Sequence, residues 1–94
     1  MNRQEIFEKI VIYLKDRGAK KVSVFGSYVK GKEKAGSDID IVVDFSDKKS
    51  LLDIVGMEQE LSEMLGIKVD LLTEKSISPY ILERIKNEME VIYG

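Results

Sequence analysis

The chain has 94 residues, the length of one small domain, so we expect a single domain over residues 1–94. Its 15 basic and 17 acidic residues give a net charge of −2, which does not favour a protein that binds nucleic acid by itself. Neither Cys nor His occurs, which excludes disulfides, thiol or imidazole catalysis and zinc sites built from these ligands.

The first half of the sequence predicts a helix followed by two strands. Apolar residues recur every four positions at the start of the chain, Asn2 and Glu5 have the spacing of a capping box, and Gly18 ends the pattern. In chain order we expect a helix (Arg3–Arg17), a strand (Lys21–Phe25), one or two helical turns (Ser27–Lys32), a polar loop (33–37) and a strand (Asp38–Phe45).

The second half predicts a long helix, a strand and a shorter helix. Ser50 and Asp53 form a capping box at the start of the long helix, and Gly66 ends it. We expect its buried side to comprise Leu51, Ile54, Val55, Leu61, Met64 and Leu65. A strand follows (Ile67–Leu72), then a helix that begins at Ser78-Pro79 with Leu82, Ile85 and Met89 inward, and finally Val91–Tyr93 as either a last strand or a frayed end.

This order of elements predicts an α/β or α+β fold, with a small mixed sheet and helices packed on one face of it. The connection from the Asp38–Phe45 strand to the Ile67–Leu72 strand is long enough for a right-handed parallel crossover. The connection after Phe25 is shorter and favours an antiparallel return.

Two aspartates stand out in the DIDIVVDF strand. Asp38 and Asp40 share one face because side chains alternate along a strand, and Ile39 and Ile41 share the other. Two carboxylates roughly 7 Å apart repel each other, and oxygen ligands of this kind suit Mg²⁺ together with substrate phosphates. The alternatives are a solvent-exposed face, or Asp38 as the cap of a turn.

Asp70 interrupts the apolar strand IKVDLL, where an unpaired charge would be costly. If its strand neighbours that of Asp40, the carboxylates of Asp38, Asp40 and Asp70 converge on one open face. Alternatively, Asp70 is simply solvated or paired with Lys68.

Gly26 and Ser27 lie at the end of a predicted strand, where glycine lets the backbone approach a phosphate and Ser27 adds a hydroxyl donor. The spacing of Gly26, Gly31 and Lys32 also matches a P-loop, but Glu33 replaces the Ser or Thr that would bind the metal, so we reject that motif. An EF-hand loop at Asp38–Asp44 fails because its turn glycine is missing.

The segment Phe25–Phe45 (FGSYVKGKEKAGSDIDIVVDF) resembles the signature of the DNA polymerase β-type nucleotidyltransferase superfamily, and is most similar to its minimal prokaryotic members. The resemblance implies a polymerase β-type core. It also implies that Asp38, Asp40 and Asp70 are catalytic and hold two Mg²⁺ ions, and that Gly26 and Ser27 contact the triphosphate of ATP or another NTP. Lys30 stands where relatives usually have Arg, so it would contact phosphate as a point charge and not as a bidentate fork.

Minimal members of this superfamily are often antitoxins paired with a HEPN-domain toxin. The resemblance therefore implies transfer of a nucleoside monophosphate, AMP above all, onto a tyrosine hydroxyl of such a partner. Two alternatives stay open: a non-catalytic antitoxin that neutralises by complex formation, and transfer onto RNA or a small molecule. Without a long apolar segment in the sequence we expect a cytoplasmic protein that does not bind membranes, with a homo-oligomer left open.

Overall fold

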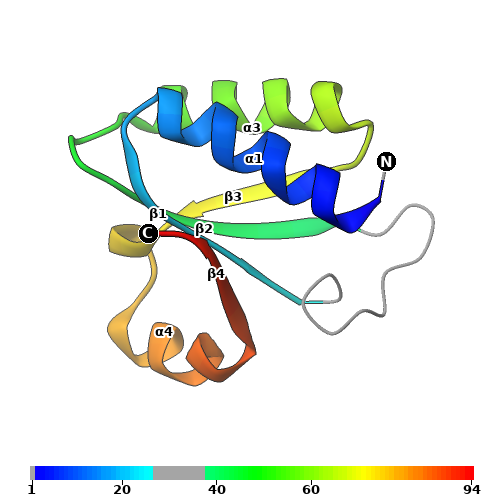
Figure 1. Cartoon of the computed structure of the whole chain (residues 1–94). Helices are drawn as coiled ribbons and strands as arrows, with labels where there is room; N and C mark the ends of the chain where they lie inside the picture. The colour runs from blue at the N-terminus through cyan, green and yellow to red at the C-terminus, as the bar shows by residue number, and fades with distance from the viewer. Residues whose placement is uncertain (1, 27–37) are drawn as a thin grey trace.

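Two long helices lie side by side on one face of a four-stranded sheet (Figure 1). The structure is a computed structural model and describes residues 2–26 and 38–94. Its elements are α1 (Arg3–Asp16), β1 (Ala19–Phe25), β2 (Ile39–Phe45), α3 (Leu51–Leu65), β3 (Val69–Thr73), α4 (Pro79–Ile85) and β4 (Met89–Tyr93), with 3-10 turns at Glu74–Ser76 and Lys86–Glu88.

The sheet has the strand order β3-β2-β1-β4. β2 and β3 are parallel, as expected for two strands joined through a crossover helix, here α3. β1 pairs antiparallel with both β2 and β4. The mixed sheet is therefore confirmed, and the C-terminal residues form an edge strand and not a frayed end.

The sequence signals at the helix ends act as expected. Asn2 Oδ1 accepts a hydrogen bond from Glu5 N–H at 2.9 Å at the start of α1. Ser50 and Asp53 form the full reciprocal capping box of α3, with N···O distances of 3.1 and 3.0 Å. Gly66 ends α3 in the left-handed conformation, at φ 67°, which suits glycine because it has no Cβ.

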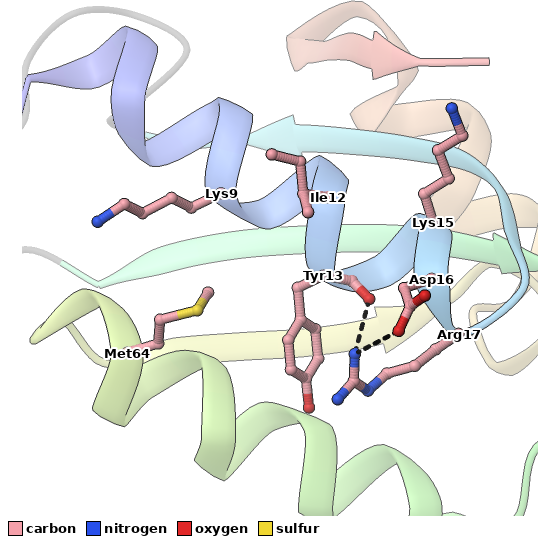
Figure 2. Close-up of a pocket in the computed structure, with 7 residues that line it drawn as sticks. All are labelled: Lys9, Ile12, Tyr13, Lys15, Asp16, Arg17 and Met64. Atoms are coloured by element: carbon pink, nitrogen blue, oxygen red, sulfur yellow. Dashed lines mark hydrogen bonds and ion pairs between the residues drawn. The ribbon is translucent and has the colours of Figure 1, made fainter.

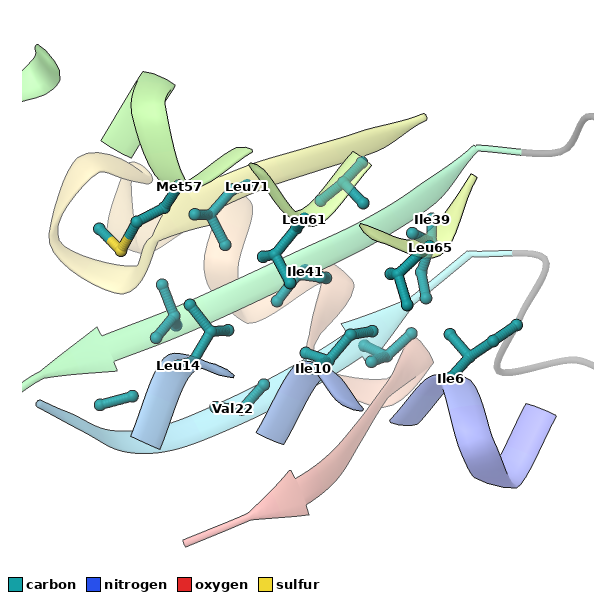
Figure 3. Packing of buried hydrophobic residues seen from close by; sticks show 14 of the residues in the cluster. Ile6, Ile10, Leu14, Val22, Ile39, Ile41, Met57, Leu61, Leu65 and Leu71 are labelled. Carbon is teal, nitrogen blue, oxygen red and sulfur yellow. The ribbon is translucent and has the colours of Figure 1, made fainter. Parts of the chain in front are cut away.

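One apolar core fills the space between the helices and the sheet (Figure 3). α1 contributes residues at four-residue spacing, and the alternate residues of β2 that we expected to face inward do so. The fully buried members include Ile10, Leu14, Val22, Val24, Ile39, Ile41, Val43 and Leu61.

The buried side of α3 was predicted in part: Leu61 and Leu65 are buried and Ile54 packs against the core, as expected, but the other three predicted residues are exposed. Met57, Leu61 and Leu65, spaced four residues apart, face the core, whereas Leu51 is 78% exposed. Val55 and Met64, also predicted to be buried, are 40% and 43% exposed. The prediction included the apolar residues at the start of the helix and left out Met57. The burial of Met57 indicates which side of the helix packs on the sheet.

The C-terminal helix is shorter than predicted. α4 ends at Ile85, and Met89, predicted as its inward residue, is the first residue of β4. α4 lies on the side of the sheet away from α1 and α3 and has no buried residue; Leu82 and Ile85 are only half-buried (Figure 1). Among the described helices, none is both long and apolar enough to cross a membrane.

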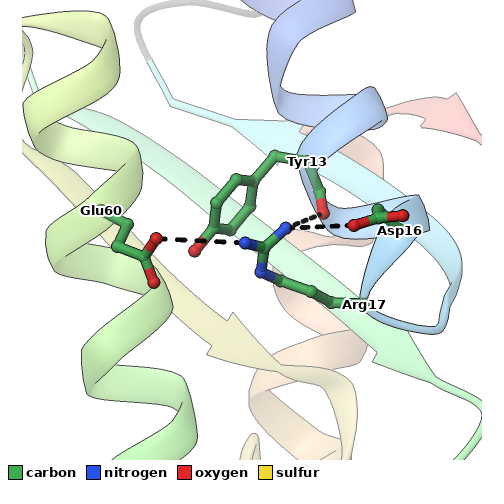
Figure 4. A network of polar contacts seen from close by, with 4 residues as sticks. All are labelled: Tyr13, Asp16, Arg17 and Glu60. Atoms are coloured by element: carbon green, nitrogen blue, oxygen red, sulfur yellow. Dashed lines mark hydrogen bonds and ion pairs between the residues drawn. The ribbon is translucent and has the colours of Figure 1, made fainter.

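A polar cluster joins the end of α1 to α3 (Figure 4). The guanidinium of Arg17 lies 3.6 Å from the centre of the Tyr13 ring, donates to the Tyr13 carbonyl at 3.0 Å, and lies 3.9 Å from a carboxylate oxygen of Glu60. Burial and the nearby Glu60 raise the pKa of the Tyr13 hydroxyl. The cluster holds the two helices together at the end of the sheet opposite to the first residues of β2.

Side chains of α3 also satisfy backbone donors of the edge strand β3. Val69 N–H donates to Ser62 Oγ at 3.0 Å, and Leu71 N–H donates to Glu58 Oε2 at 2.8 Å. These bonds fix β3 against its crossover helix and occupy donors that would otherwise be open to another strand.

Leu61→Ala should lower the free energy of unfolding by about 3 kcal/mol, since it removes a fully buried side chain and leaves a cavity. Leu52→Ala, on the same helix but 83% exposed, should change it by less than about 0.5 kcal/mol. Chemical denaturation of both variants measures the difference, and equal losses would contradict the packing of α3 described above.

Candidate active site

Asp40 and Asp70 face each other across the parallel strands β2 and β3, where they are direct Cα partners. Each is the second residue of its strand, and the residues on both sides of each aspartate are buried in the core. Because side chains alternate along a strand, this burial turns both carboxylates to the face away from α1 and α3. The convergence expected for neighbouring strands is therefore present for this pair.

The site raises the pKa of the Asp40 carboxyl. Partial burial raises the pKa of Asp40 to about 6, and the negative charge of Asp70, a hydrogen bond with Asp70 and the charge of Asp38 add to the effect. At neutral pH the site thus holds negative charges at close range, and a cation would relieve their repulsion.

Asp38 lies at the edge of this arrangement. It precedes β2 by one residue, its side chain is 45% exposed, and one of its oxygens lies 3.9 Å from Lys68 Nζ. Lys68 thus pairs with Asp38 and not with Asp70, the partner considered from the sequence. Within residues 2–26 and 38–94, no three acidic side chains come together as a ready-made metal-binding group.

Gly26 directly follows β1 and lies beside Asp40. Phe25 is the Cα partner of Asp40, and Gly26 has φ 87°, a conformation that glycine adopts without strain. A Cβ on Gly26 would lie 2.9 Å from Asp40 Oδ2. The positive φ therefore favours glycine here, and a larger residue would also displace the Asp40 carboxylate.

Several predicted residues lie outside the described part of the chain. These are Ser27 and Lys30, the proposed phosphate contacts, together with the predicted helical turns at Ser27–Lys32 and the predicted polar loop at 33–37. Their roles remain predictions.

A groove of about 830 Å³ lies between α1 and α3 and not at the carboxylates (Figure 2). Its lining includes the Tyr13–Arg17 pair of the polar cluster, with Ile12 and Met64 on either side. We do not assign the chemistry to it, because its carboxylate, Asp16, is paired with Arg17 at 3.7 Å and no second carboxylate lines it. Sequence patterns did not indicate this groove, since it depends on how two helices pack.

Residues 7–92 match the family model of the nucleotidyltransferase domain. The chain belongs to the nucleotidyltransferase domain family. The residues of the family resemblance, from Phe25 to Phe45, lie inside the matched region. The nucleotidyltransferase is therefore an enzyme of the class that the sequence predicted.

Curated relatives and solved structures agree with this assignment. The nucleotidyltransferase is 50% identical over 88 residues to a candidate protein adenylyltransferase of Methanocaldococcus jannaschii, covering 94% of this chain and 95% of the relative. It is 40% identical over 72 residues to the protein adenylyltransferase MntA of Thermococcus cleftensis, covering 77% and 73% of the two chains.

Two crystal structures of toxin–antitoxin complexes contain a similar chain. One, solved with AMP-PNP, superposes with a TM-score of 0.86 at 28% identity, covering 94% of this chain and 73% of the other. The other holds a tri-AMPylated HEPN toxin and MNT antitoxin of Shewanella oneidensis, with a TM-score of 0.82 at 25% identity over 99% and 73% of the two chains.

The carboxylates of the nucleotidyltransferase fit the divalent cation that the family implies. Asp40 and Asp70 provide hard oxygen donors on adjacent strands, and burial together with the neighbouring carboxylates raises the pKa of Asp40, so a bound cation would stabilise its charged form. Asp40 and Asp70 would hold the ion, with Asp38 as a further oxygen donor one residue before the strand.

Asp40→Asn should make the unfolding free energy of the nucleotidyltransferase less sensitive to pH between about 4 and about 7. The folded protein binds the Asp40 proton more tightly than the unfolded chain does, so the contribution of Asp40 to stability is fully present below about pH 4 and is lost as the pH rises through about 6. Because the carboxylate is only partly buried, we expect a difference of about 1 kcal/mol. Denaturation at a series of pH values measures it, and parallel pH profiles for both proteins would contradict the described site.

Gly26→Ala should destabilise the nucleotidyltransferase by about 1–3 kcal/mol, since alanine is strained at positive φ and its Cβ would contact Asp40. Gly56→Ala is the matched control: Gly56 lies inside α3 with no atom within 4 Å of the added Cβ, so this change should stabilise by about 0.5–1 kcal/mol. Thermal unfolding distinguishes the two, and a Gly26→Ala variant as stable as wild type would argue against the close approach of Gly26 to Asp40.

Proposed function

We propose that this nucleotidyltransferase moves AMP from ATP onto a tyrosine hydroxyl of a partner protein, and that it acts in this way as the antitoxin of a HEPN-type toxin. The observation that carries the proposal is the Asp40–Asp70 pair, in which two mutually repelling carboxylates are held at one open face of the sheet. A purely structural role would not need two such charges side by side.

The relatives support the choice of donor and acceptor. Protein adenylyltransferase is the activity named for the Thermococcus cleftensis relative. AMP-PNP accompanies one of the similar toxin–antitoxin complexes, and an AMPylated HEPN toxin is present in another. Together they favour a nucleotide donor and a protein acceptor over RNA or a small molecule.

The proposed reaction is an in-line displacement at the α-phosphorus of ATP. The acceptor oxygen forms a new bond to phosphorus, the bond to the β-phosphate oxygen breaks, and pyrophosphate leaves. Asp70 takes the hydroxyl proton, since it faces the open side of the sheet and Asp40 lies next to it. Negative charge shifts to the leaving pyrophosphate as the bond breaks. A divalent cation held by these carboxylates would neutralise this charge on the phosphates.

The residues around the carboxylates position the donor. Gly26 brings the end of the β1 backbone close to Asp40 without a side chain between them, so the phosphates can lie against main-chain N–H groups. In the proposal, Ser27 and Lys30 contact the triphosphate with a hydroxyl and a point charge.

Transfer of labelled AMP onto the cognate toxin tests the proposal. Asp38→Asn/Asp40→Asn should lower the transfer rate at least about a hundredfold, since stabilisation of phosphate charge through a bound cation is worth several kcal/mol. Asp44→Asn is the matched control: it lies on the same face of β2, is half-buried and pairs with Lys20 at 3.6 Å, so its transfer rate should stay within a fewfold of wild type.

Growth of cells that express the toxin separates catalysis from binding. If Asp38→Asn/Asp40→Asn no longer protects these cells while it still binds the toxin, the catalytic account stands. If the variant protects as well as wild type, the protein neutralises by complex formation and the proposed transfer is not its antitoxin activity.

A further inference from the structure

The two edges of the sheet differ in how their backbone groups are used. At the β3 edge, Ser62 and Glu58 accept hydrogen bonds from two strand N–H groups, so α3 closes that edge. β4 is the other edge, and no further strand among the described residues pairs with its outer side. An open edge of this kind is a template for a further strand.

A groove of about 480 Å³ with a mixed lining follows this edge between α1 and β4, and its polar members are Gln4, Glu8 and Glu90. Phe7, Val11 and Ile12 line it from the helix, and Val91 and Ile92 line it from the strand. Ile12 is 69% exposed and Val91 is 49% exposed, so both present apolar surface to solvent in the single chain. A strand added at β4 would cover this surface as well as the backbone edge.

Two acidic side chains, Glu8 and Glu90, line the groove, and the basic side chains of Arg3 and Lys15 flank its two ends. Glu90 lies near one end of β4, 3.8 Å from Arg3, where both side chains are well exposed. Lys15 lies at the opposite end, with its ammonium 5.5 Å from the centre of the Tyr93 ring. A two-fold axis through the middle of β4 exchanges these ends, so it brings Glu90 of one copy toward Lys15 of the other.

We propose that the β4 edge binds a second copy of this chain, with the two β4 strands antiparallel across a two-fold axis at Val91. Val91 then lies opposite Val91 of the other copy, and Met89 lies opposite Tyr93. The same patch serves on both copies, as a closed dimer requires, and the two sheets join into one. The proposal does not depend on nucleotide transfer, because the groove lies at the edge strand, away from the Asp40–Asp70 pair.

Charge reversal tests the arrangement through sedimentation velocity. Wild type should dimerise, while Glu90→Lys and Lys15→Glu should each weaken self-association at least about tenfold, since each change turns two attractions into two repulsions. An equimolar mixture of the two variants should dimerise again, because both contacts in the mixed dimer then join opposite charges. Glu63→Lys and Lys48→Glu, at exposed positions outside the groove, are matched controls and should dimerise as wild type does.

A single cysteine tests the register independently. The chain has no native Cys, so Val91→Cys introduces one thiol per copy. Direct partners in an antiparallel pair have Cα atoms about 4.5–5.5 Å apart, within the range that a disulfide spans. Val91→Cys should form a covalent dimer under mild oxidation much faster than Leu52→Cys, an exposed position on α3.

Three results would overturn the proposal. The first is a wild-type protein that stays monomeric over a broad range of concentration. The second is a dimer that neither charge reversal weakens and that Val91→Cys does not trap. The third is protection of the β4 amides from hydrogen exchange only when the toxin is added, which would assign the edge to a strand of the toxin.

Discussion

The parallel pairing of β2 with β3 is the constraint on which the site depends. Its register makes Asp40 and Asp70 direct partners, and the buried residues on either side of each aspartate prevent either strand from turning over. A shift of one residue in either strand would place a carboxylate in the core. The apolar face of the sheet therefore holds together two charges that would otherwise separate.

α3 connects the stability of the domain to the geometry of the site. It joins β2 to β3, covers the core with Met57, Leu61 and Leu65, and binds the β3 backbone through Glu58 and Ser62. The position of Asp70 thus follows from the packing of this helix. By contrast, α4 contributes no buried residue, and the part of the fold around it is held mainly by the pairing of β4 with β1.

Local signals in the sequence were sufficient for much of this fold. Alternation in DIDIVVDF and IKVDLL separates core from carboxylate faces, and the Ser50–Asp53 box and Gly66 mark the ends of α3. The buried side of α3 was predicted only in part, with Leu51, Val55 and Met64 wrongly included, because helical spacing fits more than one side when apolar residues are abundant. Features that require tertiary contacts, such as the Lys68–Asp38 pair and the Arg17–Glu60 contact, leave no pattern in a single sequence. The roles of Ser27 and Lys30 still rest on the family resemblance.

Thermal unfolding with Mg²⁺ and ATP tests most directly whether the Asp40–Asp70 pair is a nucleotide site. Ligand at about a hundred times its Kd should stabilise the wild type by about 2.7 kcal/mol, a rise in Tm on the order of 10–20 °C for a domain of this size. The account predicts this rise only when both ligands are present, and predicts its loss in Asp40→Asn/Asp70→Asn. An equal rise in the variant would place the nucleotide elsewhere on the molecule and contradict the central claim.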